Sequence, residues 1–382
     1  MKNPLRKVRL LTPGPTPVST DILLSLAKEV IHHRGDEFKE ILVECTNLLK
    51  YVFKTENDVF ILTSSGTGAM EGAIVNVLSQ GDRAIVLNTG AFGRRWKNIL
   101  DSYGIEVKEI EYEWGDYVKL EDLEKILKED PNYQAIFCQH TETSTGVIND
   151  IKGIKEVAKK YGDIPVIVDA VSSLLGEELF MDDWELDIVV SGSQKGLMLP
   201  PGLAFIAVNK KMWKRIESSK LPKFYFSLIH AKNYFERGQT PWTPAVNTIF
   251  ALKEGLKRIK EYGIENLWAR YKKLAQATRE GVKAIGLELF AKRPCNVVTS
   301  IKVPEGVDGI RIVKDMQKDF GVRIAGGQRE YKGKIVRFAH MGYIDEMDVV
   351  MGIAGLELTL SKLGYKFEIG NGVRKVLEVF NG

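Results

Sequence analysis

The chain of 382 residues contains no apolar run long enough to cross a membrane, because its apolar stretches end after a few residues at Asp, Gly or Ser. A membrane-spanning helix needs about 20 predominantly apolar residues. The N-terminal sequence Met1–Pro4 leads into turn-forming prolines and lacks the apolar centre of a secretory signal peptide. We therefore expect a soluble, cytoplasmic protein that has no membrane partner.

Cysteine and histidine are scarce. The three cysteines, Cys45, Cys138 and Cys295, form no CxxC pair, and the five histidines include no HExxH motif. These absences give no indication of a zinc site, another metal site or a disulfide framework. The net charge is +4, and no block of five residues carries charge of one sign. The sequence therefore gives no basis for a nucleic-acid partner.

What the chain does have is length and ample apolar material. At 382 residues with 44% hydrophobic residues, it is too long for one ordinary domain of roughly 150 residues. The prolines and Gly14 in the first twenty residues predict an extended arm, because proline disfavours helix and glycine allows a tight bend. We expect an arm at residues 1–20, a large domain at 21–262 and a small domain at 263–382.

Helical and strand patterns alternate through the expected large domain. Short runs rich in Val, Ile and Leu predict buried strands, and stretches with a 3.6-residue period predict helices. This alternation predicts an α/β domain whose mostly parallel sheet is sandwiched between helices. Strands are expected at 58–62, 83–87, near Val107, 135–138, 166–169 and 186–190, with helices at 21–31, 38–53, 69–78, 95–103, 120–128 and 151–161.

Beyond Trp242 the pattern changes, and we place the domain boundary near Gly263. The pattern predicts two long charged helices and then a short α+β region that ends in a helix. The helices are expected at 245–262, 264–285, 309–320 and 345–363, and the strands at 297–303 and 334–338.

Lys195 follows a predicted strand and the small residues at 191–194, and it precedes the turn sequence Pro-Pro-Gly at 200–202. Lysine is rarely buried unless its amine has a partner or a task. An amine whose pKa is lowered by desolvation or by nearby cations can form a Schiff base with an aldehyde cofactor. The alternative is a surface lysine in a β-turn.

Asp169 ends the apolar strand predicted at 166–169. Ligands of open α/β sheets bind beyond the carboxyl ends of the strands. A carboxylate beside a pyridine nitrogen keeps that nitrogen protonated and makes the ring an electron sink. The alternative for Asp169 is a helix N-cap.

Two glycine-rich turns follow predicted strands. Ser64–Gly68 leads into a helix, where backbone N–H groups and hydroxyls can bind an anion. Phe92, between Gly90 and Gly93, can present a flat face to an aromatic ring. The alternatives are an ordinary turn with a serine cap and an aromatic side chain that packs at a turn.

Arg337 lies in the predicted strand of the small domain, between apolar neighbours on both faces. Its planar guanidinium suits the α-carboxylate of an amino acid. The alternative is a structural ion pair with an Asp or a Glu.

Taken together, these motifs resemble class V aminotransferases, which are pyridoxal-phosphate enzymes of fold type I. The resemblance is to the alanine–glyoxylate and serine–pyruvate group and spans essentially the whole chain. The motifs are Thr12–Thr16, His33–Phe38, Ser65–Thr67, Thr143–Gly146, Asp169, Ser193–Lys195 and Arg337–Gly342.

The resemblance implies a role for each of these positions. Lys195 would carry the Schiff base to pyridoxal 5'-phosphate and move the proton, and Asp169 would pair with the pyridine nitrogen. Phe92 would stack on the ring, where close relatives often carry Trp, and Thr143 would sit by the ring hydroxyl. The phosphate would be held by Ser65, Gly66, Thr67 and Gln194, with Thr243 reaching the phosphate of the neighbouring subunit, and the substrate would meet Arg337 and Gly14.

The resemblance also implies a homodimer with shared active sites and ping-pong transamination of alanine or serine with a 2-oxo acid such as glyoxylate or pyruvate. Thr240 is an alternative to Thr243 at the subunit interface. Alternative enzymes are an aspartate or aminoethylphosphonate transaminase and, less favoured, a phosphoserine transaminase. A cysteine desulfurase or selenocysteine lyase would need a cysteine on a mobile loop, whereas Cys295 precedes a predicted strand and is interpreted as structural. A non-catalytic subunit of a larger assembly is the remaining alternative.

Overall fold

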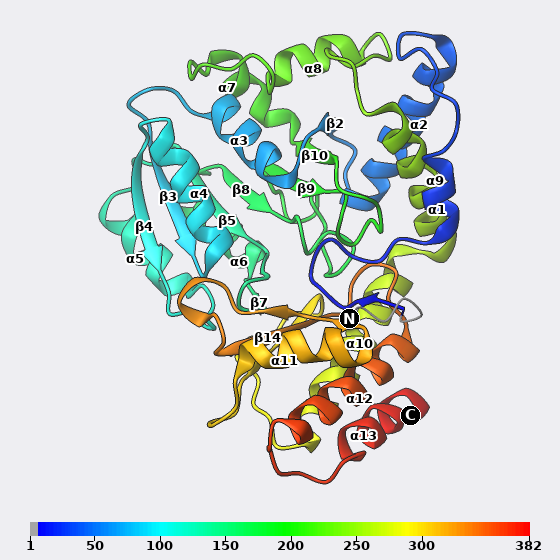
Figure 1. Ribbon diagram of the computed structural model, residues 1–382. Helices are drawn as coiled ribbons and strands as arrows, with labels where there is room; N and C mark the ends of the chain where they lie inside the picture. Colours follow the sequence, from blue (N-terminus) through cyan, green and yellow to red (C-terminus); the bar gives the residue numbers. More distant parts are fainter. Residues whose placement is uncertain (1–6) are drawn as a thin grey trace.

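The computed structural model describes residues 7–382 and contains a large twisted sheet (Figure 1). Its strand order is β2-β10-β9-β8-β5-β3-β4. Strand β10 pairs antiparallel with β2 and β9, whereas the remaining neighbours are parallel, so the expected mostly parallel sheet is confirmed. The strands are β2 Asp58–Thr63, β3 Arg83–Asn88, β4 Glu106–Glu111, β5 Ala135–Gln139, β8 Val166–Asp169, β9 Ile188–Gly192 and β10 Leu203–Val208.

The sheet is buried on both faces. On β3, Ile85 and Leu87 belong to one apolar core, whereas Ala84 and Val86 belong to a second core on the opposite face. Side chains alternate between the two faces of a strand, so a strand covered on both sides reads as a continuous apolar run. Strand β10 is such a run, although no strand is predicted there from the sequence.

Helices form the two outer layers. The first core includes residues of α2, α5, α6 and α9, and the second includes residues of α3, α4, α7 and α8. Among the described residues, no helix is long and apolar enough to span a membrane. The helices are α1 Thr20–Ser25, α2 Asp36–Phe53, α3 Gly66–Val77, α4 Ala91–Ser102, α5 Leu120–Glu129, α6 Ile151–Lys160, α7 Trp213–Ser218, α8 Leu228–Phe235 and α9 Val246–Tyr262.

Helix α1 is shorter than the helix expected at 21–31. It ends at Ser25, and the next residues make shorter-range turns, with the N–H of Leu26 donating to Leu23. The amide of Asn247 on α9 donates to the carbonyls of Leu26 and Lys28. These carbonyls are therefore satisfied by tertiary contacts, which the local sequence pattern does not reveal.

The C-terminal region, residues 263–382, carries a second, antiparallel sheet of order β11-β14-β13. The helix expected at 309–320 is α11, which continues as one π-helical segment, Met316–Phe320. Helix α13 follows α12, whereas the sequence pattern predicts no helix beyond α12. The elements are α10 Ile264–Ala284, β11 Val298–Lys302, α11 Gly309–Asp315, β12 Val322–Arg323, β13 Ala325–Gly326, β14 Ile335–Ala339, α12 Glu346–Lys362 and α13 Asn371–Asn381.

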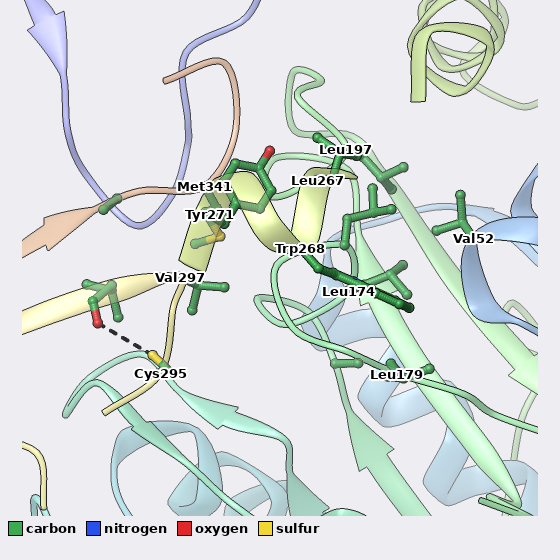
Figure 2. Packing of buried hydrophobic residues seen from close by; sticks show 14 of the residues in the cluster. Val52, Leu174, Leu179, Leu197, Leu267, Trp268, Tyr271, Cys295, Val297 and Met341 are labelled. Carbon is green, nitrogen blue, oxygen red and sulfur yellow. Dashed lines mark hydrogen bonds between the residues drawn. The ribbon is translucent and has the colours of Figure 1, made fainter. Parts of the chain in front are cut away.

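The large-sheet region and the C-terminal region share one apolar core. Leu174 and Leu197 of the large-sheet region belong to the same buried cluster as Tyr271 of α10 and Met341, which follows β14 (Figure 2). The thiol of Cys295 is buried within this cluster and donates to the carbonyl of Val298. The two regions are therefore packed together, and the boundary at Gly263 stays a prediction.

The N-terminal arm lies between the two regions, where the blue segment of Figure 1 passes beside the orange strands. Strand β1, Arg9–Leu10, pairs parallel with β12. The carbonyl of Leu11 then accepts a hydrogen bond from the N–H of Ala339 at the end of β14. The arm is thus held by the C-terminal region before it reaches the large sheet.

Helix α13 is held by one buried carboxylate. Glu357 of α12 is 1% exposed and accepts hydrogen bonds from the backbone N–H groups of Gly370, Gly372 and Val373 at the start of α13. A helix N-terminus leaves such N–H groups without intrahelical partners. The Glu357 carboxylate therefore satisfies these donors and interacts favourably with the dipole of α13.

Replacing Glu357 with Ala should lower the free energy of unfolding by about 2–4 kcal/mol, because buried donors are left unpaired. Urea denaturation measures this loss. Glu368→Ala removes an exposed carboxylate from the same connection and should change the free energy by less than about 0.5 kcal/mol. Equal effects of the two substitutions would contradict the assigned role of Glu357.

Candidate active site

A cavity of about 250 Å³ lies beyond the C-terminal ends of β8 and β9. This is where parallel α/β sheets bind their ligands. A larger hollow of about 670 Å³ lies beside the arm, α9 and α10, and none of the predicted site residues line it. The predicted residues that line the smaller cavity are Gly14, Ser65, Gly66, Thr67, Phe92, Thr143, Asp169, Gln194 and Lys195.

Lys195 lies three residues after the end of β9, and it is buried rather than placed in a surface turn. Its Nζ donates a hydrogen bond to the backbone carbonyl of Pro13 in the arm. Burial lowers the pKa of Lys195 to about 8, and this effect is opposed by Asp169 and reinforced by Arg337 and Arg95. A lowered pKa makes the amine a better nucleophile and proton carrier near neutral pH.

The arm is fastened to the lysine loop. The hydroxyl of Thr16 donates to the carbonyl of Lys195 at 3.0 Å, and the N–H of Thr16 donates to the carbonyl of Gln194 at 3.2 Å. Gly14 has a φ of +140°, and a Cβ there would lie 2.6 Å from Nζ of Lys195. Glycine at position 14 therefore allows the arm to approach the amine.

Asp169 is the last residue of β8 and is 5% exposed. One of its carboxylate oxygens, Oδ1, accepts a hydrogen bond of 2.8 Å from the N–H of Val171. Burial raises the pKa of Asp169 to about 6, partly offset by this hydrogen bond. The side chain is therefore an anion at neutral pH and lines the same cavity as Lys195.

The turn after β2 forms one wall of the cavity, and α3 begins at Gly66. The first N–H groups of a helix have no intrahelical acceptor and are suited to bind an anion. A Cβ on Gly66 would lie 2.6 Å from the side chain of Val171, and a Cβ on Gly68 would lie 2.0 Å from Oγ of Ser64. The glycines therefore let this turn pack closely against its surroundings.

Two polar atoms of the cavity lining are buried without a partner among residues 7–382, namely Oε1 of Gln194 and Oγ1 of Thr141. Buried polar atoms are nearly always hydrogen-bonded in native proteins. Both atoms therefore fit a polar ligand in this cavity.

Phe92 is the second residue of α4, and a buried glutamate fixes its backbone. Oε2 of Glu142 accepts hydrogen bonds from the N–H groups of Phe92 and Gly93 at 2.9 and 3.1 Å. Oε1 of the same carboxylate accepts from the N–H and the hydroxyl of Ser144. A Cβ on Gly90 would lie 2.6 Å from the side chain of Glu142, so glycine is needed for this approach.

Arg337, in β14, is 5% exposed and does not line the cavity itself. Its guanidinium donates to the carbonyl of Thr143 at 2.6 Å and to the carbonyl of Gly326 at 3.0 Å. Within residues 7–382 it forms no ion pair, so the structural-bridge alternative receives no support from the described contacts. Burial lowers the pKa of Arg337 to about 10, so the group remains a cation at neutral pH.

Thr243 lies outside the cavity and is exposed. Thr240 is buried, and its hydroxyl donates to the carbonyl of Trp242 at 2.7 Å. Of the two threonines, Thr243 thus has the hydroxyl that remains accessible from outside this chain.

Three polar residues of this site are not among those predicted from the sequence. Arg95, on α4, donates to the hydroxyl of Thr67 at 3.1 Å, and Ser172 has its hydroxyl 3.4 Å from that of Thr143. Glu142 is the third. Arg95 follows Phe92 by three residues and Glu142 directly precedes Thr143, but only the folded structure shows that Arg95 lines the cavity and that Glu142 binds the backbone at Phe92.

Known proteins resemble this chain in both sequence and structure. The family model described as "Aminotransferase class-V" matches residues 22–343. A protein of Synechococcus named soluble hydrogenase, small subunit, is 42% identical over 98% of this chain and 99% of its own length. The L-aspartate–glyoxylate aminotransferase of Paracoccus denitrificans is 34% identical over 97% and 95% of the two chains, respectively.

Two further relatives carry the same chemistry in their names. The serine–glyoxylate aminotransferase of Methylorubrum extorquens is 34% identical over 95% of this chain and 94% of its own length. The crystal structure of ureidoglycine–glyoxylate aminotransferase from Bacillus subtilis superposes with a TM-score of 0.94, at 30% identity and 100% coverage of both chains. On this match of sequence and fold, the chain belongs to the class V aminotransferase family and is an aminotransferase of fold type I.

Proposed function

We propose that this enzyme transfers an amino group between a small amino acid, alanine or serine, and glyoxylate or pyruvate, with pyridoxal 5'-phosphate as its cofactor. The observation that carries the proposal is the buried amine of Lys195, which shares one cavity with the carboxylate of Asp169. The three aminotransferases described above share glyoxylate in their names but differ in the donor, which is aspartate, serine or ureidoglycine. Glyoxylate is therefore the better supported of the two acceptors.

The residues present fit pyridoxal phosphate. The cavity offers an amine for the aldehyde, a carboxylate for the ring nitrogen and a helix N-terminus for the phosphate. The buried polar atoms of Gln194 and Thr141 have no partner within the described chain and gain one when a polar group binds. When bound, the cofactor supplies the aldehyde and an electron-withdrawing ring that stabilises negative charge on the substrate carbon.

The protein's own groups divide the remaining work. Asp169 holds negative charge at one end of the cavity, which favours a protonated ring nitrogen. Lys195 can hold or release a proton at Nζ near neutral pH because burial lowers its pKa to about 8. Arg337 binds and orients the substrate carboxylate, and its guanidinium is already positioned by the carbonyls of Thr143 and Gly326.

The proposed active site includes a residue of a second subunit. The exposed Thr243 is the candidate for reaching the phosphate in a neighbouring chain, since the hydroxyl of Thr240 is already bonded within its own chain. The aromatic residues around this segment are also accessible: Phe224 is 68% exposed, and its ring lies 4.7 Å from that of Trp242. Such an exposed aromatic cluster is typical of subunit interfaces.

The alternatives receive less support. Cys295 is fully buried and packed in the shared core, and burial raises its pKa to about 12, whereas a desulfurase needs a reactive cysteine near the substrate. The Synechococcus relative is named as a hydrogenase subunit, but the chemical groups assembled around Lys195 are those that amino transfer requires.

The direct test is a screen of half-reactions with the cofactor-loaded enzyme. Alanine or serine, added alone, should convert the bound cofactor to its amino form and release one equivalent of the 2-oxo acid, as measured by absorbance and product analysis. Lys195→Ala should slow this conversion by about 10²- to 10⁴-fold or more, because the proton carrier is lost. If only aspartate converts the bound cofactor, or if cysteine releases sulfur, the proposed donor is replaced by one of the alternatives.

Arg337→Lys should lower kcat/KM for alanine and serine alike, by about 10- to 150-fold, because the charge remains but the forked geometry that binds a carboxylate is lost. Steady-state kinetics with both donors measure the effect, and thermal denaturation serves as the control. A large loss of stability with unchanged kinetics would make Arg337 a structural residue. A loss for only one donor would place Arg337 at the donor's side chain.

A further inference from the structure

Arg95 is a cation in the cavity to which neither the sequence motifs nor the comparisons assign a role. It lies in the second turn of α4, three residues after Phe92, and it lines the cavity with Ser65, Gly66 and Thr67. Its guanidinium donates to the hydroxyl of Thr67 at 3.1 Å. Its central carbon lies 4.7 Å from the centroid of the Phe92 ring.

The balance of charges in the cavity favours an anion-binding role for Arg95. Among the residues that line it, Lys195 and Arg95 carry positive charge and Asp169 carries negative charge. A phosphate monoester carries a charge between −1.5 and −2 near neutral pH. In the proposed function Lys195 would be engaged with the aldehyde end of the cofactor, so Arg95 is the cation that remains to balance the phosphate.

The donors of Arg95 also remain available. A guanidinium has five N–H donors, and the structure gives Arg95 one hydrogen bond, to Thr67, and no ion pair within residues 7–382. Its neighbour Arg94 is different, because Arg94 pairs with Glu111 at 2.8 Å and with Glu330 at 3.8 Å. A partly buried arginine without an acidic partner, next to a helix N-terminus, is suited to bind an anion.

The position of Arg95 indicates which anionic group it can bind. The residue that it contacts, Thr67, is the second residue of α3, where the helix N-terminus faces the cavity. The other arginine of the site, Arg337, contacts the carbonyls of Thr143 and Gly326 instead. The two guanidinium groups are thus held by different walls, one by the turn that begins α3 and the other by the segment that carries Thr143.

We propose that Arg95 binds the phosphate group of the cofactor and is the charged member of the cradle formed by Ser65, Gly66 and Thr67. The Phe92 ring holds the flat guanidinium in place, and the Thr67 hydroxyl orients it. This assignment rests on the proposed function, because that proposal supplies pyridoxal phosphate as the ligand.

The test compares pyridoxal 5'-phosphate with pyridoxal, which has the same ring and aldehyde but no phosphate. Both compounds are titrated into cofactor-free, full-length protein, and binding is followed by absorbance. Arg95→Gln should raise Kd for pyridoxal phosphate by about 10- to 150-fold and change Kd for pyridoxal by less than about threefold. Arg95→Lys keeps the charge without the fork and should give an intermediate loss for pyridoxal phosphate.

Arg94→Gln is the matched control, since it removes the same charge from the neighbouring position, outside the cavity lining, and should leave both values of Kd unchanged. Pyridoxal controls for the influence of Arg95 on the pKa of Lys195, which affects both compounds equally. If Arg95→Gln does not fold, as judged by circular dichroism, the test rests on Arg95→Lys, which should weaken the binding of pyridoxal phosphate more than that of pyridoxal.

Equal losses for the two compounds would make Arg95 a support for Phe92 and overturn the assignment, as would no loss for either compound. A wild-type protein that binds neither compound would instead overturn the proposed function, and the phosphate assignment with it. If the wild-type protein binds pyridoxal phosphate and the Arg95 variants keep the same preference for it over pyridoxal, only the Arg95 assignment is overturned.

Discussion

The contact between the amine of Lys195 and the carbonyl of Pro13 is the constraint on which the arrangement of the site depends. The arm makes this contact only because Gly14 has no side chain and because Thr16 is bonded to the carbonyls of Gln194 and Lys195. The same arm is paired through β1 with β12 of the C-terminal region. The position of the amine is therefore tied both to the large sheet and to the region that carries Arg337.

The charges of the site have to balance one another. Lys195, Arg337 and Arg95 supply positive charge, while Asp169 and Glu142 supply carboxyl groups. Burial shifts the pKa values toward the neutral forms, to about 8 for Lys195, about 6 for Asp169 and about 10 for Arg337. Asp169 and Arg337 therefore stay charged at neutral pH. The pKa of the Lys195 amine lies close to neutral pH, as expected for a group that exchanges protons.

Much of this could be predicted from the sequence, because both the fold and the central residues follow local patterns. Buried parallel strands appear as apolar runs; Asp169 ends one of them, and Lys195 follows another by three residues. The family motifs add Ser65, Phe92 and Thr143, which the structure brings to one cavity.

What the sequence could not reveal depends on contacts between distant segments. Helix α1 ends early because Asn247, more than 200 residues away, bonds to the carbonyls that follow it. Helix α13 is amphipathic, but its start depends on the buried carboxylate of Glu357 in α12. Arg95 resembles any surface arginine of a charged helix until α4 is packed against the turn that begins α3.

The central claim is that burial beside the arm prepares the amine of Lys195 for chemistry near neutral pH. The most direct measurement is the rate at which cofactor-free protein attaches pyridoxal phosphate covalently, followed as a function of pH by borohydride trapping and peptide mapping. Only the neutral amine is a nucleophile, so the rate should rise with pH and level off above a midpoint near 8. A midpoint near 10.5, the ordinary value for lysine, or attachment at another lysine would contradict the account.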